Sequence, residues 1–222
     1  MITGDLKPVA EIVPTIAEFK KVLVVGCGGC VSVCLTGGDR EARQLALELA
    51  AQRHYTADPP DFTVQTIERQ CETDWLETYF QVPEDVDAVL SLACGAGVQT
   101  MAAVYDPLPV IPALNTTFLG ANIKQGVFQE MCRGCGDCVL AYTGGICPVA
   151  RCAKGLYNGP CGGTNNGSCE IRTDVPCAWA MIFYRLKRMD KLDLMLEVRH
   201  PPDWRPGGGE GPRQLKAHIK EP

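Results

Sequence analysis

The stretch KVLVVGCGGC at residues 21–30 predicts a buried strand that ends in a turn rich in glycine and cysteine. Residues 21–25 read Lys-Val-Leu-Val-Val, a short β-branched run that resembles a buried parallel strand. A helix capped by Asp39 is expected next, because apolar residues recur along one helical face: Ala42, Leu45, Ala46, Leu49 and Ala50. Strand, turn and helix in this order form the repeating unit of a parallel sheet.

The same alternation continues toward residue 120. The further predicted elements are strands at 62–67, 87–92 and 110–111 and helices at 74–81 and 97–105. Strands that alternate with helices favour an α/β fold with a small parallel, doubly wound sheet. We therefore predict an α/β domain over residues 15–120.

Regular periodicity stops after this domain. Between Met131 and Cys177 the chain has eight cysteines and nine glycines. So few large apolar groups cannot build an ordinary core, and we expect this segment to fold around bound metal, whose binding free energy then becomes folding free energy. The second predicted domain, residues 121–200, is a cysteine-rich cluster-binding domain with a ferredoxin-like motif and a C-terminal helix.

That helix is predicted to start at Asp174 and Pro176 and to run toward Leu192. Its apolar stripe consists of Trp179, Ile182, Phe183 and Leu186. Residues 201–222 are rich in proline and glycine and predict an extended tail. Trp204 in this tail either docks on a partner protein or packs on its own chain.

Composition narrows the class of protein further. The 222 residues are 46% hydrophobic and carry a net charge of -5, so neither a membrane-spanning protein nor a nucleic-acid-binding protein is expected. The first residues lack the basic and apolar regions of a signal peptide, and we expect a cytoplasmic location. Thirteen cysteines in a reducing compartment indicate metal binding, and the three histidines lie outside the cysteine clusters. Any metal is therefore expected to be held by sulfur.

Four cysteines follow predicted strands: Cys27, Cys30, Cys71 and Cys94. The carboxyl ends of parallel strands share one edge of the sheet, so we predict that these thiols converge on one four-cysteine site. Cys34 is an alternative to Cys30, and small buried thiols without a ligand role are the alternative for the whole group. The glycines here do not form a dinucleotide-binding fingerprint, because Val31 stands where its third glycine belongs.

The strongest local motif is C-x2-C-x2-C at Cys132, Cys135 and Cys138. This spacing is typical of ferredoxin-type [4Fe-4S] ligands, and Cys147, followed by Pro148, has the form of the fourth ligand. Four cysteines then remain for a further cluster, a zinc ion or inert thiols: Cys152, Cys161, Cys169 and Cys177. Zinc competes as the metal because four thiolates also form structural zinc sites. Thirteen cysteines allow three clusters at most.

Several longer strings carry a family resemblance: GCGGCVSVCLTGGD, TIERQCETDW, AVLSLACGAGVQT, PALNTTFLG, CRGCGDCVLAYTGGICPVARCAKGLYNGPCGG and DVPCAWAMIFYRLK. Together they resemble the small iron-sulfur subunit of two-subunit methylenetetrahydrofolate reductases, over residues 11–204. The C-terminal part is similar to the methylenetetrahydrofolate reductase C-terminal domain family.

The resemblance implies a non-catalytic, electron-transfer subunit of an oxidoreductase complex in one-carbon metabolism, the Wood-Ljungdahl pathway. It implies two to three [4Fe-4S] clusters here, with zinc as an option at one C-terminal site, and FMN or FAD only on a partner flavoprotein that reduces methylenetetrahydrofolate. An upstream electron donor protein is also implied. The partner's TIM barrel needs ~250 residues, more than this chain has. The alternative function is a zinc-binding structural or assembly subunit that scaffolds a partner oxidoreductase.

Overall fold

The KVLVVGC stretch forms the second strand, β2 (Lys21–Cys27), of a four-stranded parallel sheet. In this computed structural model, β2 lies between β3 (Asp61–Ile67) and β4 (Ala88–Leu92), and β5 (Val110–Pro112) extends the sheet beyond β4. All three pairings are parallel. The order β3-β2-β4-β5 confirms the predicted parallel sheet and its four strands.

The structure describes residues 1–52, 59–207 and 214. The chain divides into two compact units, Met1–Gln129 (unit 1) and Glu130–Pro222 (unit 2). The boundary lies after Gln129, whereas the sequence interpretation placed it after residue 120. The predicted C-terminal tail lies largely outside the described residues, which end with 207 except for residue 214.

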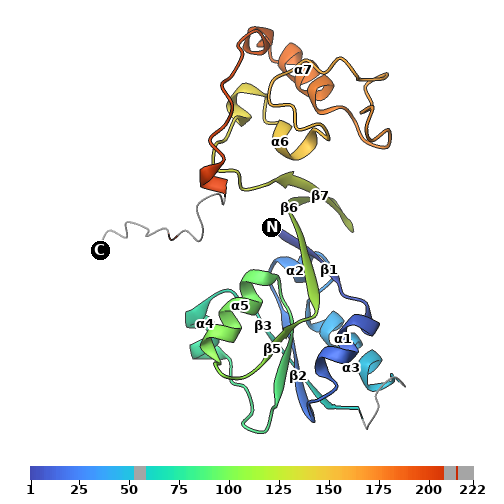
Figure 1. Cartoon of the computed structure of the whole chain (residues 1–222), viewed down its shortest axis with the longest axis vertical. Coiled ribbons are helices and arrows are strands. Elements are labelled where there is room, and N and C mark those ends of the chain that lie inside the picture. The colour runs from blue at the N-terminus through green and yellow to red at the C-terminus, as the bar shows by residue number, and fades with distance from the viewer. Residues whose placement is uncertain (53–58, 208–213, 215–222) are drawn as a thin grey trace. The chain divides into compact units, whose positions relative to one another are not determined.

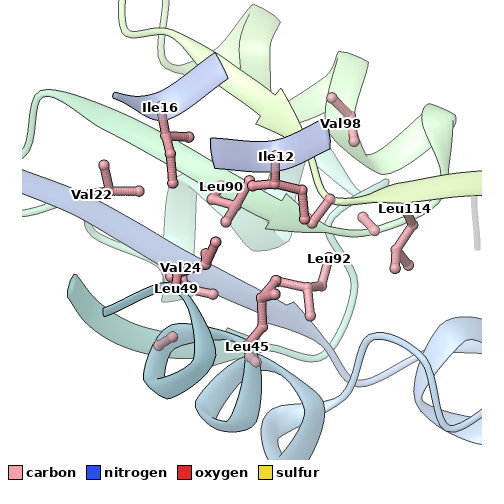
Figure 2. Close-up of a cluster of buried hydrophobic side chains, with 14 of the residues drawn as sticks. Ile12, Ile16, Val22, Val24, Leu45, Leu49, Leu90, Leu92, Val98 and Leu114 are labelled. Atoms are coloured by element: carbon pink, nitrogen blue, oxygen red, sulfur yellow. The ribbon is translucent and has the colours of Figure 1, made fainter. Parts of the chain in front are cut away.

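Helices cover both faces of the parallel sheet, as a doubly wound fold requires (Figure 1). They are α1 (Val9–Ile16) and α3 (Asp39–Ala50) on one face and α4 (Thr73–Tyr79) and α5 (Gly95–Val104) on the other. Side chains of β2 alternate between the faces, with Val22 and Val24 in one apolar cluster and Leu23 and Val25 in the other. Figure 2 shows the first cluster, in which α1 and α3 side chains meet those of β2 and β4.

A second sheet was not predicted. It has the order β1-β6-β7 and consists of β1 (Ile2–Leu6), β6 (Leu114–Lys124) and β7 (Val127–Cys132), with β1 antiparallel to β6. Most residues of β6 are exposed or half-buried, so this strand lacks the apolar run that marks a buried one. Gly126, between β6 and β7, has a positive φ of 74°, which suits glycine in a tight turn.

Unit 2 contains little regular structure before its main helix, as predicted. The elements are η1 (Leu140–Tyr142), α6 (Pro148–Arg151), α7 (Ala178–Arg188), η2 (Leu192–Met195) and η3 (Arg205–Gly207). Unit 1 has a similarly short helix, α2 (Cys30–Val33). Across the described part of the chain, no helix combines the length and the apolar character needed to cross a membrane.

Unit 2 has a small apolar core of its own. Its buried members are Ile146, Cys177, Trp179, Ile182 and Leu186. Three of them come from α7, so the helix supplies most of the apolar surface that the preceding segment lacks.

Three local expectations are also corrected. The N-cap of α3 is Gly38, and Asp39 is the first helical residue, where its carboxylate pairs with Arg43. Helix α7 begins at Ala178 with Cys177 as its N-cap, later than the predicted start. Phe183 belongs to the predicted stripe but is 38% exposed, because the core covers only part of that stripe.

Candidate metal centres

The candidate ligands form three groups, which we call thiol sets A, B and C. Set A is Cys27, Cys30, Cys71 and Cys94 in unit 1; set B is Cys132, Cys135, Cys138 and Cys147, and set C is Cys152, Cys161, Cys169 and Cys177, both in unit 2. All thirteen cysteines are free thiols, so none is consumed by a disulfide.

Set A lies at the carboxyl edge of the parallel sheet. Cys27 is the last residue of β2, Cys71 lies between β3 and α4, and Cys94 is the N-cap of α5 after β4. Partial desolvation raises the pKa of the Cys71 thiol, and negative charge on Cys27 and Cys94 raises that pKa further. These three thiols from three strand exits are therefore electrostatic neighbours.

The C-x-x-C turn of set A lies against the exit of β3. The Cys27 thiol contacts the carbonyl oxygen of Glu68 at 3.8 Å, and a Cβ on Gly28 would stand 3.2 Å from the Glu68 Cα. Only glycine fits at position 28 without pushing the two segments apart. The turn thus carries Cys30, an exposed residue, past the same edge.

Cys34 has a different setting from set A. It is buried, and its thiol donates to the carbonyl oxygen of Ile2 in β1 at 3.6 Å. Burial raises the pKa of Cys34, and negative charge on Cys30 also raises it. Cys34 therefore packs toward the antiparallel sheet, and these contacts favour Cys30 over Cys34 as the fourth member of set A.

Gln70 and Ser91 form a buried hydrogen-bond network that joins the strand ends next to set A. Gln70 is fully buried, and its side-chain amide donates to the carbonyl oxygens of Val25 and Gly26 at 3.0 and 3.2 Å. Its carbonyl oxygen accepts from the Ser91 hydroxyl at 2.6 Å. Gln70 immediately precedes Cys71, so it ties that cysteine to the ends of β2 and β4. Sequence reasoning missed both residues, because a glutamine within the polar string ERQCE reads as exposed loop.

Two backbone amides donate hydrogen bonds to sulfur atoms of set B. The amide of Gly134 donates to the Cys132 sulfur at 3.3 Å, and the amide of Ala150 donates to the Cys147 sulfur at 3.4 Å. Amide hydrogen bonds to ligand sulfurs are one means by which proteins set the potential of an iron-sulfur cluster. The first and the last thiol of set B, Cys132 and Cys147, thus each accept a hydrogen bond from a nearby backbone amide.

Tyr157 lies near the two middle cysteines of set B, Cys135 and Cys138. Burial raises the pKa of its hydroxyl, and negative charges on Asp137, Cys135 and Cys138 raise it further, while Arg199 opposes the shift. Cys135 and Cys138 are therefore both close to this one ring.

Set C gathers around the start of α7. Cys152 and Cys161 pack against the apolar core that contains Cys177, and the Cys169 amide donates to the carbonyl oxygen of Val175 at 3.0 Å. Burial alone would raise the pKa of the Cys177 thiol, but hydrogen bonds outweigh burial and lower it. The hydrogen-bonding groups are the amides of Ala180 and Trp179 and the side chains of Thr164 and Cys161. Cys161 and Cys177 are thus neighbours in this core.

Trp204 lines a cavity of about 470 Å³ together with Cys135, Val149 and Tyr157 of its own unit. A Cβ added to Gly207 would meet the Cys135 carbonyl oxygen at 3.1 Å, so η3 also lies against set B. Trp204 is 54% exposed. The ring therefore packs partly on its own chain and leaves the remainder accessible.

Free thiols are the donor type that thiolate-bound iron requires. Among the described residues, no three Cys, His, Asp or Glu side chains lie close enough to hold one metal ion together. A [4Fe-4S] cluster has a different requirement, because its four thiolates bind four separate iron atoms. Sets A and B each offer four free thiols, and two backbone amides donate to sulfurs of set B.

Fold and thiol sets together define a cysteine-rich α/β protein whose second unit carries eight thiols, seven of them on loops and one at the end of β7. Residues 111–205 match the family model described as methylene-tetrahydrofolate reductase C terminal. This confirms the resemblance for that part of the chain, which contains all of sets B and C. No curated protein and no solved structure matches the chain.

Proposed function

We propose that this chain is an iron-sulfur subunit that passes electrons to a methylenetetrahydrofolate reductase flavoprotein. The observation that carries the proposal is the placement of eight free thiols, three of them spaced C-x2-C-x2-C, inside the segment that matches the reductase family. The proposed partner supplies the flavin, FMN or FAD, and the folate site. An upstream protein donates the electrons.

In this proposal the residues of the chain bind and orient clusters, and none acts on folate. Cys27, Cys30, Cys71 and Cys94 would hold one [4Fe-4S] cluster, with Gln70 and Ser91 fixing the strand exits that carry them. Set B would hold a second cluster, and set C a third cluster or a zinc ion. A bound cluster accepts and releases single electrons, which is the chemistry that a flavin partner requires.

The first experiment is an anaerobic purification with iron, sulfide and zinc analysis. A brown protein whose visible absorption bleaches on reduction is expected. Replacing Cys71 or Cys94 with serine should lower iron by about one cluster per chain, because each removes a thiolate ligand of set A. Cys34→Ser is the matched control and should keep the full iron content. Unchanged iron in both ligand variants would remove set A from the proposal.

The second experiment tests the partner. Cluster-loaded full-length protein is mixed with a methylenetetrahydrofolate reductase flavoprotein, and binding and flavin reduction are followed anaerobically. A truncated chain ending at Val198 removes Trp204, so loss of binding in that variant alone would place docking in the tail. Failure of the full-length protein to bind or reduce the flavoprotein would reject the electron-transfer function. Zinc without iron would support the structural alternative instead.

A further inference from the structure

The side chain of Arg151 is a cation with no carboxylate partner among the residues that the structure describes. Arg151 is the last residue of α6, and its Nε atom is buried with no hydrogen-bond partner in the described part of the chain. Its two terminal nitrogens lie 4.0 Å from the sulfur atoms of Met131 and Met181. Among the ion pairs of the described chain, none includes Arg151.

This environment does not satisfy the hydrogen-bonding capacity or the charge of an arginine side chain. The guanidinium remains charged at every physiological pH and offers five N–H donors, whereas a thioether sulfur is only a weak acceptor. Partly burying a cation without an anion costs free energy, and buried charges in proteins are normally paired or bound to a metal centre. The site therefore suits an anion that bonds to the guanidinium.

The position of the guanidinium indicates which anion. Met131 directly precedes Cys132 of set B, and the Met181 amide donates to the carbonyl oxygen of Cys177 of set C at 3.0 Å. Arg151 itself stands between Cys147 and Cys152 in the sequence. The cation thus lies where the backbones that carry the two thiol sets approach each other.

We propose that Arg151 pairs with a thiolate-ligated iron-sulfur cluster of unit 2 and raises its reduction potential. The inference rests on the proposed function and extends it to one tuning residue. Four thiolates make such a cluster anionic, and reduction adds one more negative charge. A neighbouring cation stabilises the reduced form more than the oxidised form, so its presence favours uptake of the electron.

The test is a redox titration of anaerobic, cluster-loaded full-length protein, followed by electron paramagnetic resonance. Arg151→Met removes the charge and keeps an unbranched side chain, and a unit 2 cluster should then reduce at a more negative potential. Arg151→Lys keeps the charge and should recover part of the shift. Arg133→Met is the matched control: this arginine lies within the C-x2-C motif, but it is exposed and paired with Glu130. Its replacement should move the potential less.

Equal potentials in wild type and Arg151→Met, both with full iron, would overturn the inference. If the variants lose iron, the stabilities of the metal-free wild type and variant, measured by unfolding, distinguish a role in pairing with the cluster from a packing role. An unpaired cation destabilises the metal-free fold, so metal-free Arg151→Met should be at least as stable as wild type. A less stable metal-free variant would assign Arg151 a packing role only. Wild-type protein that binds no iron would overturn the proposed function itself, and this inference with it.

Discussion

Gln70 has more effect on set A than its place in a polar loop would suggest. Its amide holds the backbone of Val25 and Gly26 just before Cys27, while its carbonyl oxygen holds Ser91 three residues before Cys94. Gly97 allows α5 to approach, since a Cβ there would stand 3.0 Å from the Gln70 Cβ. One side chain therefore sets the relative positions of three cysteine-bearing segments.

Gln70→Ala should destabilise unit 1 by about 1–3 kcal/mol for each buried polar group left without a partner. The Ser91 hydroxyl would lose Gln70 as its acceptor, and the carbonyl oxygens of Val25 and Gly26 would lose Gln70 as a donor. Urea unfolding of metal-free protein measures the change, with Gln44→Ala as the control, because exposed Gln44 bonds only to Glu48 on α3. We expect the control to stay within about 0.5 kcal/mol of wild type. Equal stability of the two variants would show that the network contributes nothing.

Asp87 provides a pH-dependent contact at the opposite edge of the sheet. Its carboxylate accepts from the amides of Lys21 and Lys20, both at 2.9 Å, and these hydrogen bonds hold the pKa of Asp87 below its ordinary value. A lowered folded-state pKa means stability that is present above the unfolded-state pKa of about 3.9 and is lost as pH falls through the folded-state pKa.

Asp87→Asn should therefore destabilise the protein at pH 7, and the deficit should shrink as the pH falls below about 4. Thermal unfolding of metal-free wild type and variant at both pH values measures the difference. A deficit of the same size at both values would mean that the carboxylate charge has no part in the contact.

At the scale of elements, α7 supplies the core of unit 2. Ile182 and Leu186 are fully buried, and the Trp179 indole N–H donates to the carbonyl oxygen of Leu156 at 3.0 Å. The helix thus attaches the preceding cysteine-rich loops through apolar contacts and one buried hydrogen bond.

Ile182→Ala should destabilise unit 2 by about 2–5 kcal/mol, because it removes buried methyl groups and leaves a cavity. Phe183→Ala on the same helix is the matched control and should cost clearly less, since Phe183 is partly exposed. Hydrogen exchange of the α7 amides measures both changes within unit 2. Similar losses of protection would contradict the assignment of Ile182, rather than Phe183, to the core.

The sequence predicted the buried strands β2 and β4, but it did not predict the exposed strand β6 or helix α1, although α1 contributes to the core. Strands β2 and β4 are mostly apolar and buried because helices cover both faces, so their pattern is strong. Strand β6 is largely exposed, and its sequence carries no comparable signal. Helical spacing placed Phe183 on the stripe of α7, but spacing alone does not show how wide a stripe the core covers.

The candidate site was predictable to a similar extent. Parallel strands must end at one edge, so the placement of Cys27, Cys71 and Cys94 at that edge follows from topology. The roles of Gln70 and Arg151 depend on contacts between segments distant in sequence, for which single-sequence patterns have no signal.

At the scale of the whole molecule, the two units differ in the origin of their stability. Unit 1 has two apolar clusters, one on each face of its parallel sheet. Unit 2 has one small cluster, and exposed or half-buried loops connect α6 to α7. If sets B and C bind metal, that binding supplies the folding free energy that the small core does not.

Removing metal with an iron chelator should therefore open unit 2 and leave unit 1 folded. We expect trypsin to cleave first between α6 and α7, after Lys154 and Arg172, which are exposed residues whose side chains form ion pairs with Glu170 and Asp174. Exposed ion pairs contribute little stability, so they cannot protect this loop once the thiols lose their metal. Arg43 is the internal control: it is exposed on α3, but the helix packs on the sheet, and its peptide bond should resist cleavage. Mass spectrometry of the fragments from metal-loaded and metal-free protein identifies the sites. Equal resistance of the α6–α7 loop in both forms would show that the small core around α7 orders unit 2 without metal.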